Sequence, residues 1–205
     1  MKLPIPTKSE PLSGEIQPLW KTAHDWLRPA LGQGSIAIDG TCGNGKDTLF
    51  LCQETGHQGT VIGLDIQQAA ITETADLLSR HDLNAVLLCV DHSRLDRILD
   101  ARGITRVDAA IFNLGYLPGG DHSVTTASST TCDALQAVLR RASPRFRLSV
   151  VAYQGHPGGK QEAFAVRNLL ENFGCAEFQL TRITGRNPDL GPIFFGIERL
   201  HRTSS

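Results

Sequence analysis

Short runs of apolar residues, each followed by a polar residue, recur along most of the chain, and the segments between them carry apolar residues at helical spacing. Alternating strands and helices predict an α/β fold with a doubly wound, mostly parallel sheet. We expect seven strands, at residues 36–38, 60–65, 85–90, 107–112, 148–153, 175–183 and 193–200. A loop rather than a helix joins the last two, which predicts an antiparallel edge strand.

The same pattern places helices between these strands and one helix before the first of them. The apolar spacing predicts helices at residues 18–31, 46–54, 67–80, 130–142 and 161–173, and a short one around 95–99. A chain of 205 residues with 40% hydrophobic content can bury one sizeable core. We therefore expect one domain over residues 18–205, preceded by an N-terminal extension of residues 1–17.

The first expected strand runs into a glycine-rich turn at residues 35–48, SIAIDGTCGNGKDT. Gly40, Gly43 and Gly45 permit positive φ angles and a close approach of the backbone to a bound molecule. A helical pattern follows the turn. A strand, a glycine turn and a helix in this order predict a ligand site.

Three kinds of ligand bind to turns of this type. A dinucleotide turn, G-x-G-x-x-G, would need a small residue where Thr48 stands. A phosphate loop, G-x-x-x-x-G-K-[ST], matches at Gly40, Gly45 and Lys46 but has Asp47 in place of the hydroxyl that holds magnesium. The third ligand is S-adenosylmethionine, whose sulfonium and amino groups are cations that a carboxylate attracts.

The next two strands also end in aspartate, and this favours the cationic ligand. Asp39, Asp65 and Asp91 follow their strands at intervals of 26 residues. Because the carboxyl ends of parallel strands meet at one edge of a sheet, we expect three carboxylates there. Such an edge repels a triphosphate and attracts a sulfonium.

The charge of the chain is balanced overall but uneven along its length. There are 20 Lys and Arg against 21 Asp and Glu, and the net charge is −1. From Leu139 onward, ten basic residues stand against five acidic ones. This surplus is suited to contact with nucleic acid, and it is equally common on a surface that faces only solvent.

Cysteine usage and hydropathy exclude several classes of protein. The five cysteines include no C-x-x-C pair, which predicts reduced thiols rather than a disulfide framework or a zinc site. No apolar run approaches membrane length, and the first residues contain no apolar signal core. We expect a cytoplasmic protein without a metal and without a membrane partner.

Three motifs together resemble one family of methyltransferases. They are AIDGTCGNGKDTLFL, NLGYLPGGDH and YQGHPGGK, in this order, over nearly the whole chain from about Pro18. They resemble the YtqB-like class I methyltransferases, first labelled as rRNA methylases. The resemblance implies a Rossmann-like class I fold, the cofactor S-adenosyl-L-methionine, and methylation of the exocyclic amine of 5-aminomethyl-(2-thio)uridine at the tRNA wobble position. The substrate partner would be the anticodon loop of tRNA, and a homodimer is one open option.

The expected donor site follows the glycine turn and the strand ends. The turn would hold the methionyl end, Asp65 the ribose hydroxyls, and Asp91 with His92 the adenine. Helix capping by the aspartates is the structural alternative. The expected cofactor-binding residues are Asp39, Gly40, Thr41, Gly43, Asn44, Gly45, Asp47, Thr48, Asp65, Ile66, Gln67, Asp91, His92, Asn113 and Leu114.

The acceptor is expected opposite the donor, at the ends of the fourth and fifth strands. Asn113 would accept a hydrogen bond from the amine, Tyr116 would stack on the base, and His156 would remove the amine proton or else brace its loop. Asp121 and His122 are weaker candidates for the proton. His24, on the first helix, is expected to pack rather than to contact substrate. The expected substrate-binding residues are Tyr116, Tyr153, His156, Lys160 and Arg186, with Arg167 and Arg182 as further phosphate contacts.

Other functions stay open at this point. The chain could methylate a small molecule or rRNA with the same cofactor. It could be a nucleotide hydrolase built on residues 40–47, with Asp91 holding magnesium. It could also be an RNA-binding module without catalytic activity.

Overall fold

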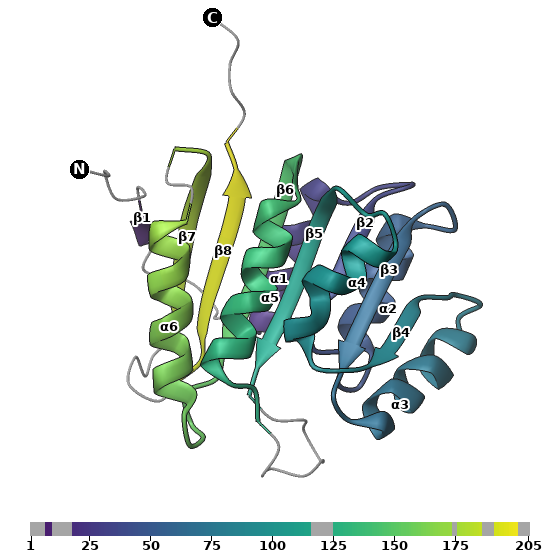
Figure 1. The fold of residues 1–205 in the computed structure, drawn as a ribbon, viewed down its shortest axis with the longest axis horizontal. Helices are drawn as coiled ribbons and strands as arrows, with labels where there is room; N and C mark the ends of the chain where they lie inside the picture. The colour runs from purple at the N-terminus through teal and green to yellow at the C-terminus, as the bar shows by residue number, and fades with distance from the viewer. Residues whose placement is uncertain (1–6, 10–17, 116–124, 174–175, 186–190, 201–205) are drawn as a thin grey trace, which may run out of the picture.

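The computed structural model describes residues 7–9, 18–115, 125–173, 176–185 and 191–200. A single sheet forms the middle layer, and helices cover both of its faces (Figure 1). The strands are β1 (Thr7–Ser9), β2 (Ile36–Asp39), β3 (Thr60–Asp65), β4 (Val86–Cys89), β5 (Val107–Leu114), β6 (Ala142–Ala152), β7 (Phe178–Thr184) and β8 (Ile193–Arg199). The α-helices are α1 (Leu19–Leu27), α2 (Lys46–Thr55), α3 (Gln68–Ser79), α4 (Leu95–Ala101), α5 (Ser128–Arg140) and α6 (Gly159–Asn172), and short 3-10 turns occupy Arg28–Ala30 and His92–Arg94.

Within the described residues, the sheet has eight strands in the order β1-β7-β8-β6-β5-β2-β3-β4. β2 pairs in parallel with both β3 and β5, so the chain winds outward from β2 in two directions. The doubly wound, mostly parallel sheet expected from the sequence is confirmed. β1 pairs in parallel with β7 and adds one strand to the seven expected, from within residues 1–17.

The sequence predicted an antiparallel strand at the edge of the sheet, but the antiparallel strand of the structure, β8, lies in its interior. β8 runs antiparallel to both β6 and β7 and lies between them. Its neighbouring residues Phe194 and Phe195 are both fully buried, and they pack into the cores on opposite faces of the sheet. β8 is therefore buried on both faces of the sheet and paired on both of its sides, as an interior strand is.

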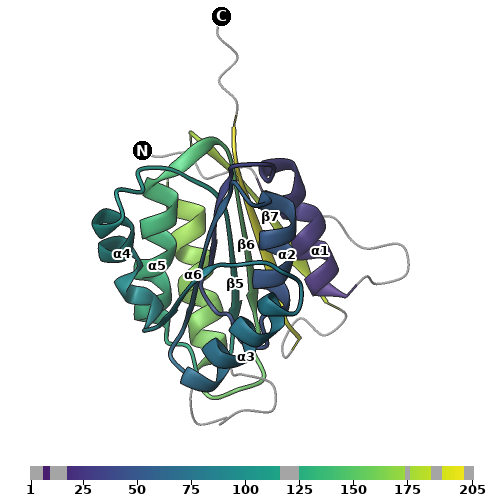
Figure 2. The same ribbon diagram turned by 90° about the vertical axis from the view of Figure 1, so that its right-hand side faces the viewer.

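Each face of the sheet carries its own hydrophobic core. Figure 2 shows α4, α5 and α6 on one face and α1 and α2 on the other. On the first face, Leu95 and Val166 pack against sheet residues such as Phe112. On the second face, Leu27 and Leu51 pack against the other side of the same strands. The central strands are thereby held rigidly between the two cores.

The fourth and fifth expected strands are longer in the structure than the apolar runs alone indicated. β5 continues to Leu114 and β6 begins at Ala142. The two strands pair from Val107–Ala142 to Leu114–Ala152, so pairing extends β5 beyond Phe112 and begins β6 before Leu148. As a result Asn113 lies within a strand rather than in a loop.

Gly40 occupies a position with no room for a side chain. A Cβ at this position would lie 2.0 Å from Cε1 of the fully buried Phe112 ring. We expect Gly40→Ala to lower the free energy of unfolding by about 1–3 kcal/mol, which thermal melting can measure. Gly32→Ala is the control, because nothing lies within 4 Å of its added Cβ. Equal melting temperatures for the two variants would contradict the prediction.

Two other expectations from composition can be compared with the structure. In the part of the chain that the structure describes, no helix is both long and apolar enough to cross a membrane. Cys42, Cys52, Cys89 and Cys132 are free thiols, and Cys175 lies outside the described residues.

Candidate functional site

A cavity of about 850 Å³ opens at the edge of the sheet where β2, β3, β5 and β6 end. This edge lies at the bottom of Figure 1, where β3 and β5 point. Its walls come from the turn after β2, the loops after β3, β4, β5 and β6, and one side of α1. A cavity of this size at the carboxyl ends of parallel strands is the usual position of a ligand site in an α/β fold.

The turn after β2 has a shape fixed by its backbone. Cys42 N donates a hydrogen bond to Leu64 O over 2.9 Å, which ties the turn to β3. Gly45, the residue before α2, has a φ of 76°, and a Cβ added to it would lie 2.9 Å from Thr74. Glycine is therefore required at this position by both conformation and space.

Three carboxylates, Asp39, Asp47 and Asp65, interact electrostatically around this turn. Asp39 is fully buried and accepts hydrogen bonds from Thr48 Oγ1 (2.6 Å) and Thr41 N (3.1 Å). Burial, together with repulsion from Asp47 and Asp65, raises the pKa of Asp39 to about 7. This edge of the sheet therefore favours a positive charge over a negative one.

The raised pKa of Asp39 predicts a pH-dependent stability. Its pKa rises from 3.8 to about 7 on folding, so the native state holds a proton that the unfolded state has lost, and stability falls as pH rises through this window. We expect the free energy of unfolding of Asp39→Asn, measured relative to the wild type by thermal or urea unfolding, to rise by about 3 kcal/mol as the pH increases from 5 to 8. Asparagine loses one of the two hydrogen bonds at every pH, so the change with pH is the quantity to compare.

Asp76→Asn, an exposed change on α3, is the matched control for this measurement. Its difference from the wild type should stay constant over the same pH range. A constant difference for Asp39→Asn as well would show that Asp39 is ionised throughout.

Asp65, at the end of β3, lines the cavity as a rigid acceptor. Its Oδ2 accepts a hydrogen bond from Gly43 N (3.0 Å) and its Oδ1 accepts one from Gln67 N (2.9 Å). Each carboxylate oxygen has a second lone pair, so each can also accept from a ligand. Two such oxygens side by side are suited to a pair of neighbouring hydroxyls.

Asp91 and His92 follow β4 and form another part of the wall. Burial raises the pKa of Asp91, but the hydrogen bonds that it accepts from Ser93 outweigh this and lower the pKa overall. Burial lowers the pKa of His92, whose ring lies edge-on to Phe112 with the centroids 6.1 Å apart. The pair therefore offers an ionised acceptor beside a neutral ring at neutral pH.

Asn113 is held from two directions at the end of β5. Its backbone N donates to Thr41 Oγ1 over 2.7 Å, and its Nδ2 donates to Asp47 Oδ2 over 2.6 Å. The other oxygen of Asp47, Oδ1, lies 2.6 Å from Nε2 of His24. The side chains of α1, α2 and β5 are thus joined in one chain of contacts at the wall of the cavity.

The loop after β6 supplies an aromatic ring and a braced histidine. Tyr153 lines the cavity with 46% of its surface exposed, and burial, followed by repulsion from Asp47, raises the pKa of its phenol. His156 Nδ1 lies 3.0 Å from Pro157 O, and its Nε2 would be 2.9 Å from a Cβ on Gly159. Both ring nitrogens therefore lie against the loop, which supports the bracing role for His156.

A buried carboxylate that the sequence did not indicate supports the opposite wall. Glu162, in the first turn of α6, is only 2% exposed and accepts hydrogen bonds from Thr126 Oγ1 and Thr131 Oγ1, each over 2.6 Å. Thr126 lines the cavity, and Thr131 lies 3.4 Å from Nε2 of His92. Glu162 therefore ties α5 and the strand-end loops together behind the cavity.

The sequence of the chain is similar to that of a known protein family. The sequence matches the family described as "Putative rRNA methylase" over residues 61–197, which is more than half of the chain. The chain belongs to this family.

One relative is similar over most of the chain. The chain is 37% identical over 175 residues to a protein of Arabidopsis thaliana named "tRNA (mnm(5)s(2)U34)-methyltransferase, chloroplastic", in a match that covers 78% of this chain and 63% of that protein. The chain thus spans less than two thirds of the length of this relative.

Solved structures of rRNA methylase relatives share the fold. A protein from Clostridium thermocellum is 33% identical with a TM-score of 0.83, and a methyltransferase from Streptococcus mutans, solved in complex with SAH, is 30% identical with a TM-score of 0.79. Each comparison covers 90% of this chain and 99% of the other chain. The fold of the chain is therefore the class I methyltransferase fold that the sequence predicted.

Most of the site residues expected from the sequence come together around the cavity. Those that line it are Gly40, Thr41, Gly43, Asn44, Asp47, Asp65, Ile66, Gln67, Asp91, His92, Asn113, Tyr153 and His156. Asp39, Gly45, Thr48 and Leu114 are buried and are not among the lining residues. Lys160 is exposed on α6 and also does not line the cavity, and Tyr116, Asp121, His122 and Arg186 lie outside the described residues.

Several lining residues were not expected from the sequence. Trp20, on α1, lines the cavity with 59% of its surface exposed, and His24 lines it beside Trp20. His24 packs as expected, but it does so at the wall of the cavity. Thr125, Thr126 and Thr130 also line it, from a hydroxyl-rich segment whose polar composition carried no signal for a site.

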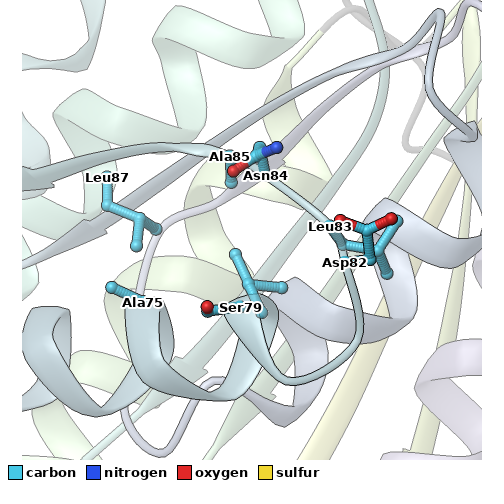
Figure 3. Close-up of a pocket in the computed structure, with 8 residues that line it drawn as sticks. Ala75, Ser79, Asp82, Leu83, Asn84, Ala85 and Leu87 are labelled. Atoms are coloured by element: carbon cyan, nitrogen blue, oxygen red, sulfur yellow. The ribbon is translucent and has the colours of Figure 1, made fainter.

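A second, smaller pocket of about 170 Å³ lies at the other edge of the sheet (Figure 3). It is bounded by the end of α3 and the segment that leads into β4, including Ala75, Ser79, Asn84 and Leu87. Its volume is well below the 300 Å³ or so of a typical ligand site. The large cavity is therefore the candidate functional site of the chain.

Proposed function

We propose that this chain is an S-adenosylmethionine-dependent RNA methyltransferase, and that its acceptor is the exocyclic amine of 5-aminomethyl-(2-thio)uridine at the tRNA wobble position. The observation that carries the proposal is the cluster of Asp39, Asp47 and Asp65 around the glycine turn, where burial, together with repulsion from the other two carboxylates, raises the pKa of Asp39 to about 7. A cavity with this charge suits a cationic donor and an amine acceptor.

The residues of the cavity fit the cofactor. Asp65 offers two oxygens for ribose hydroxyls, and Asp91 with His92 lines the side expected for the adenine. The turn over residues 40–45 brings its backbone to the wall beside the acidic cluster, where the amino and sulfonium groups belong. S-adenosylmethionine supplies an electrophilic methyl group, and the chain has to position a nucleophile against it.

The same residues fit a nucleoside triphosphate poorly. Thr48, the nearest hydroxyl to the phosphate-loop position, donates its hydrogen bond to Asp39 over 2.6 Å. Asp47 lines the cavity where the phosphates would lie. The repulsion between these carboxylates and phosphate groups disfavours the nucleotide hydrolase.

Asn113 is the residue that suits an amine acceptor. Its Nδ2 donates to Asp47, which leaves Oδ1 to accept a hydrogen bond from the amine and to orient its lone pair. Forming the new C–N bond requires the amine to lose a proton. His156, expected from the sequence either to remove it or to brace its loop, has Nε2 buried against Gly159, so its ring must turn before it can take the proton.

Two exposed aromatic residues support an unstacked base as the substrate. Trp20 and Tyr153 are 59% and 46% exposed and both line the cavity. Aromatic side chains at the rim of a site stack on bases from single-stranded loops, as in an anticodon loop. The name of the Arabidopsis relative supports the same substrate.

Transfer to defined RNAs tests the proposal. Purified protein would be given labelled S-adenosylmethionine and tRNA with or without the 5-aminomethyl group, followed by mass spectrometry of the nucleosides. We expect methyl transfer only to the tRNA that carries the amine. Transfer to ribosomal RNA would support the rRNA alternative, and donor binding without transfer to any RNA would contradict the proposal.

Two further expectations belong to this proposal. A cytoplasmic location stays an expectation, and the Arabidopsis relative is named as chloroplastic. A homodimer stays a prediction that light scattering of the purified protein can test.

A further inference from the structure

His24 is fixed in one orientation by its surroundings. Its ring stacks on Phe50, with the centroids 3.8 Å apart and the planes at 4°. The ring of Trp20 lies edge-on to it, at 5.6 Å and 70°. The His24 side chain is 12% exposed, and its Nε2 lies 2.6 Å from Asp47 Oδ1. Because a carboxylate accepts hydrogen bonds and does not donate them, Nε2 carries the hydrogen.

Asp47 connects His24 to Asn113. Its two oxygens have different partners, since Oδ1 accepts from His24 and Oδ2 accepts from Asn113 Nδ2, each over 2.6 Å. The carboxylate is 17% exposed and lies in the second position of α2. Because His24 is rigid and holds Oδ1, the position of Oδ2, which binds Asn113, is fixed as well.

This connection determines which end of the Asn113 amide faces a substrate. If the amide turned over, its Oδ1 would meet Asp47 Oδ2, and two acceptors would repel each other. The backbone of Asn113 is fixed as well, by its hydrogen bond to Thr41 Oγ1. The acceptor end of the amide is therefore the end that remains for the cavity.

We infer that His24 is a positioning residue of the methyl acceptor site: through Asp47 it holds the Asn113 amide with Oδ1 toward the acceptor, and the site thereby selects a group that donates N–H. The inference rests on the proposed function, because it assigns Asn113 to the acceptor amine. It makes α1 part of the acceptor site, together with the loops at the strand ends. His24 itself does not touch the reacting atoms.

A double-mutant cycle tests the inference with kcat, since His24 and Asn113 act through one intermediate residue. His24→Leu keeps an apolar side chain beside Phe50 and removes the donor. We expect it to lower kcat about 10-fold and to change the donor dissociation constant less than about twofold. In an Asn113→Ala background, the same change should have no further effect on kcat. A 10-fold loss in both backgrounds, or full activity of His24→Leu, would overturn the inference.

Two other substitutions keep the test decisive if His24→Leu does not fold. The side-chain N–H of glutamine reaches the position that His24 Nε2 occupies, whereas the shorter side chain of asparagine does not. We expect His24→Gln to keep at least about a third of kcat and His24→Asn to lose about 10-fold. Equal kcat values for these two variants would overturn the inference. His57→Leu, an exposed change outside the cavity, is the matched control.

A spectroscopic readout separates this inference from the proposed function. The side-chain amide protons of Asn113 should shift in the NMR spectrum of His24→Leu and stay near their original position in His24→Gln. This measurement needs neither RNA nor turnover. An unchanged Asn113 signal in His24→Leu would overturn the positioning role, whereas failure of the wild type to methylate any RNA would overturn only the proposed function.

Discussion

Asp65→Ala is expected to weaken the binding of S-adenosylmethionine by about 100-fold or more. Under the proposed function Asp65 accepts two hydrogen bonds from ribose hydroxyls, and charge-assisted bonds contribute about 1.5–3 kcal/mol each. The carboxylate also holds the glycine turn through Gly43 N over 3.0 Å, so its loss loosens the turn. Isothermal titration calorimetry with the purified protein measures the change.

Two variants make this measurement specific. Asp76→Ala, an exposed change on α3, should bind the donor as the wild type does. Asp65→Asn keeps one acceptor oxygen and should show an intermediate loss of about 10-fold. If Asp65→Ala binds the donor normally, the ribose lies elsewhere and the assignment of the donor site is wrong.

Asn113→Ala should spare donor binding and slow methyl transfer by about 100-fold or more. Loss of a preorganised hydrogen-bonding group at a reacting centre typically lowers kcat by about 10²–10³. The donor dissociation constant should change less than about twofold, because Asp65 and the glycine turn are unaffected. Single-turnover transfer to tRNA, combined with calorimetry, separates the two quantities.

Asn168→Ala is the control for this prediction, since Asn168 is exposed on α6 and does not line the cavity. A loss of donor affinity in Asn113→Ala equal to its loss of rate would place Asn113 in the donor site instead. Unchanged kcat would remove Asn113 from the acceptor site altogether.

The sequence predicted the sheet well because its strands are short apolar runs separated by helical patterns. It was wrong about β8, which lies between β6 and β7. The connection by a loop correctly indicated an antiparallel strand. Phe194 and Phe195 indicate burial on both faces of the sheet, but a pattern read one strand at a time does not reveal which strands are its neighbours.

The carboxylates at one edge of the sheet could be predicted because they follow strand ends at regular spacing. Asp39, Asp65 and Asp91 all lie at one edge, as parallel strands require. Contacts between distant segments could not be predicted in the same way. Asp47 and His24 are 23 residues apart, and only the packing of α1 on α2 brings them within 2.6 Å.

The interior position of β8 affects how the protein is made. β6 and β7 are joined through β8, so a nascent chain that ends before Ile193 leaves both with unpaired backbone groups. The same chain lacks Phe194 and Phe195, and each of the two cores then has a gap. Synthesis on the ribosome therefore has to reach the last strand before the protein can settle into its native state, and until then the exposed apolar surface is a target for chaperones.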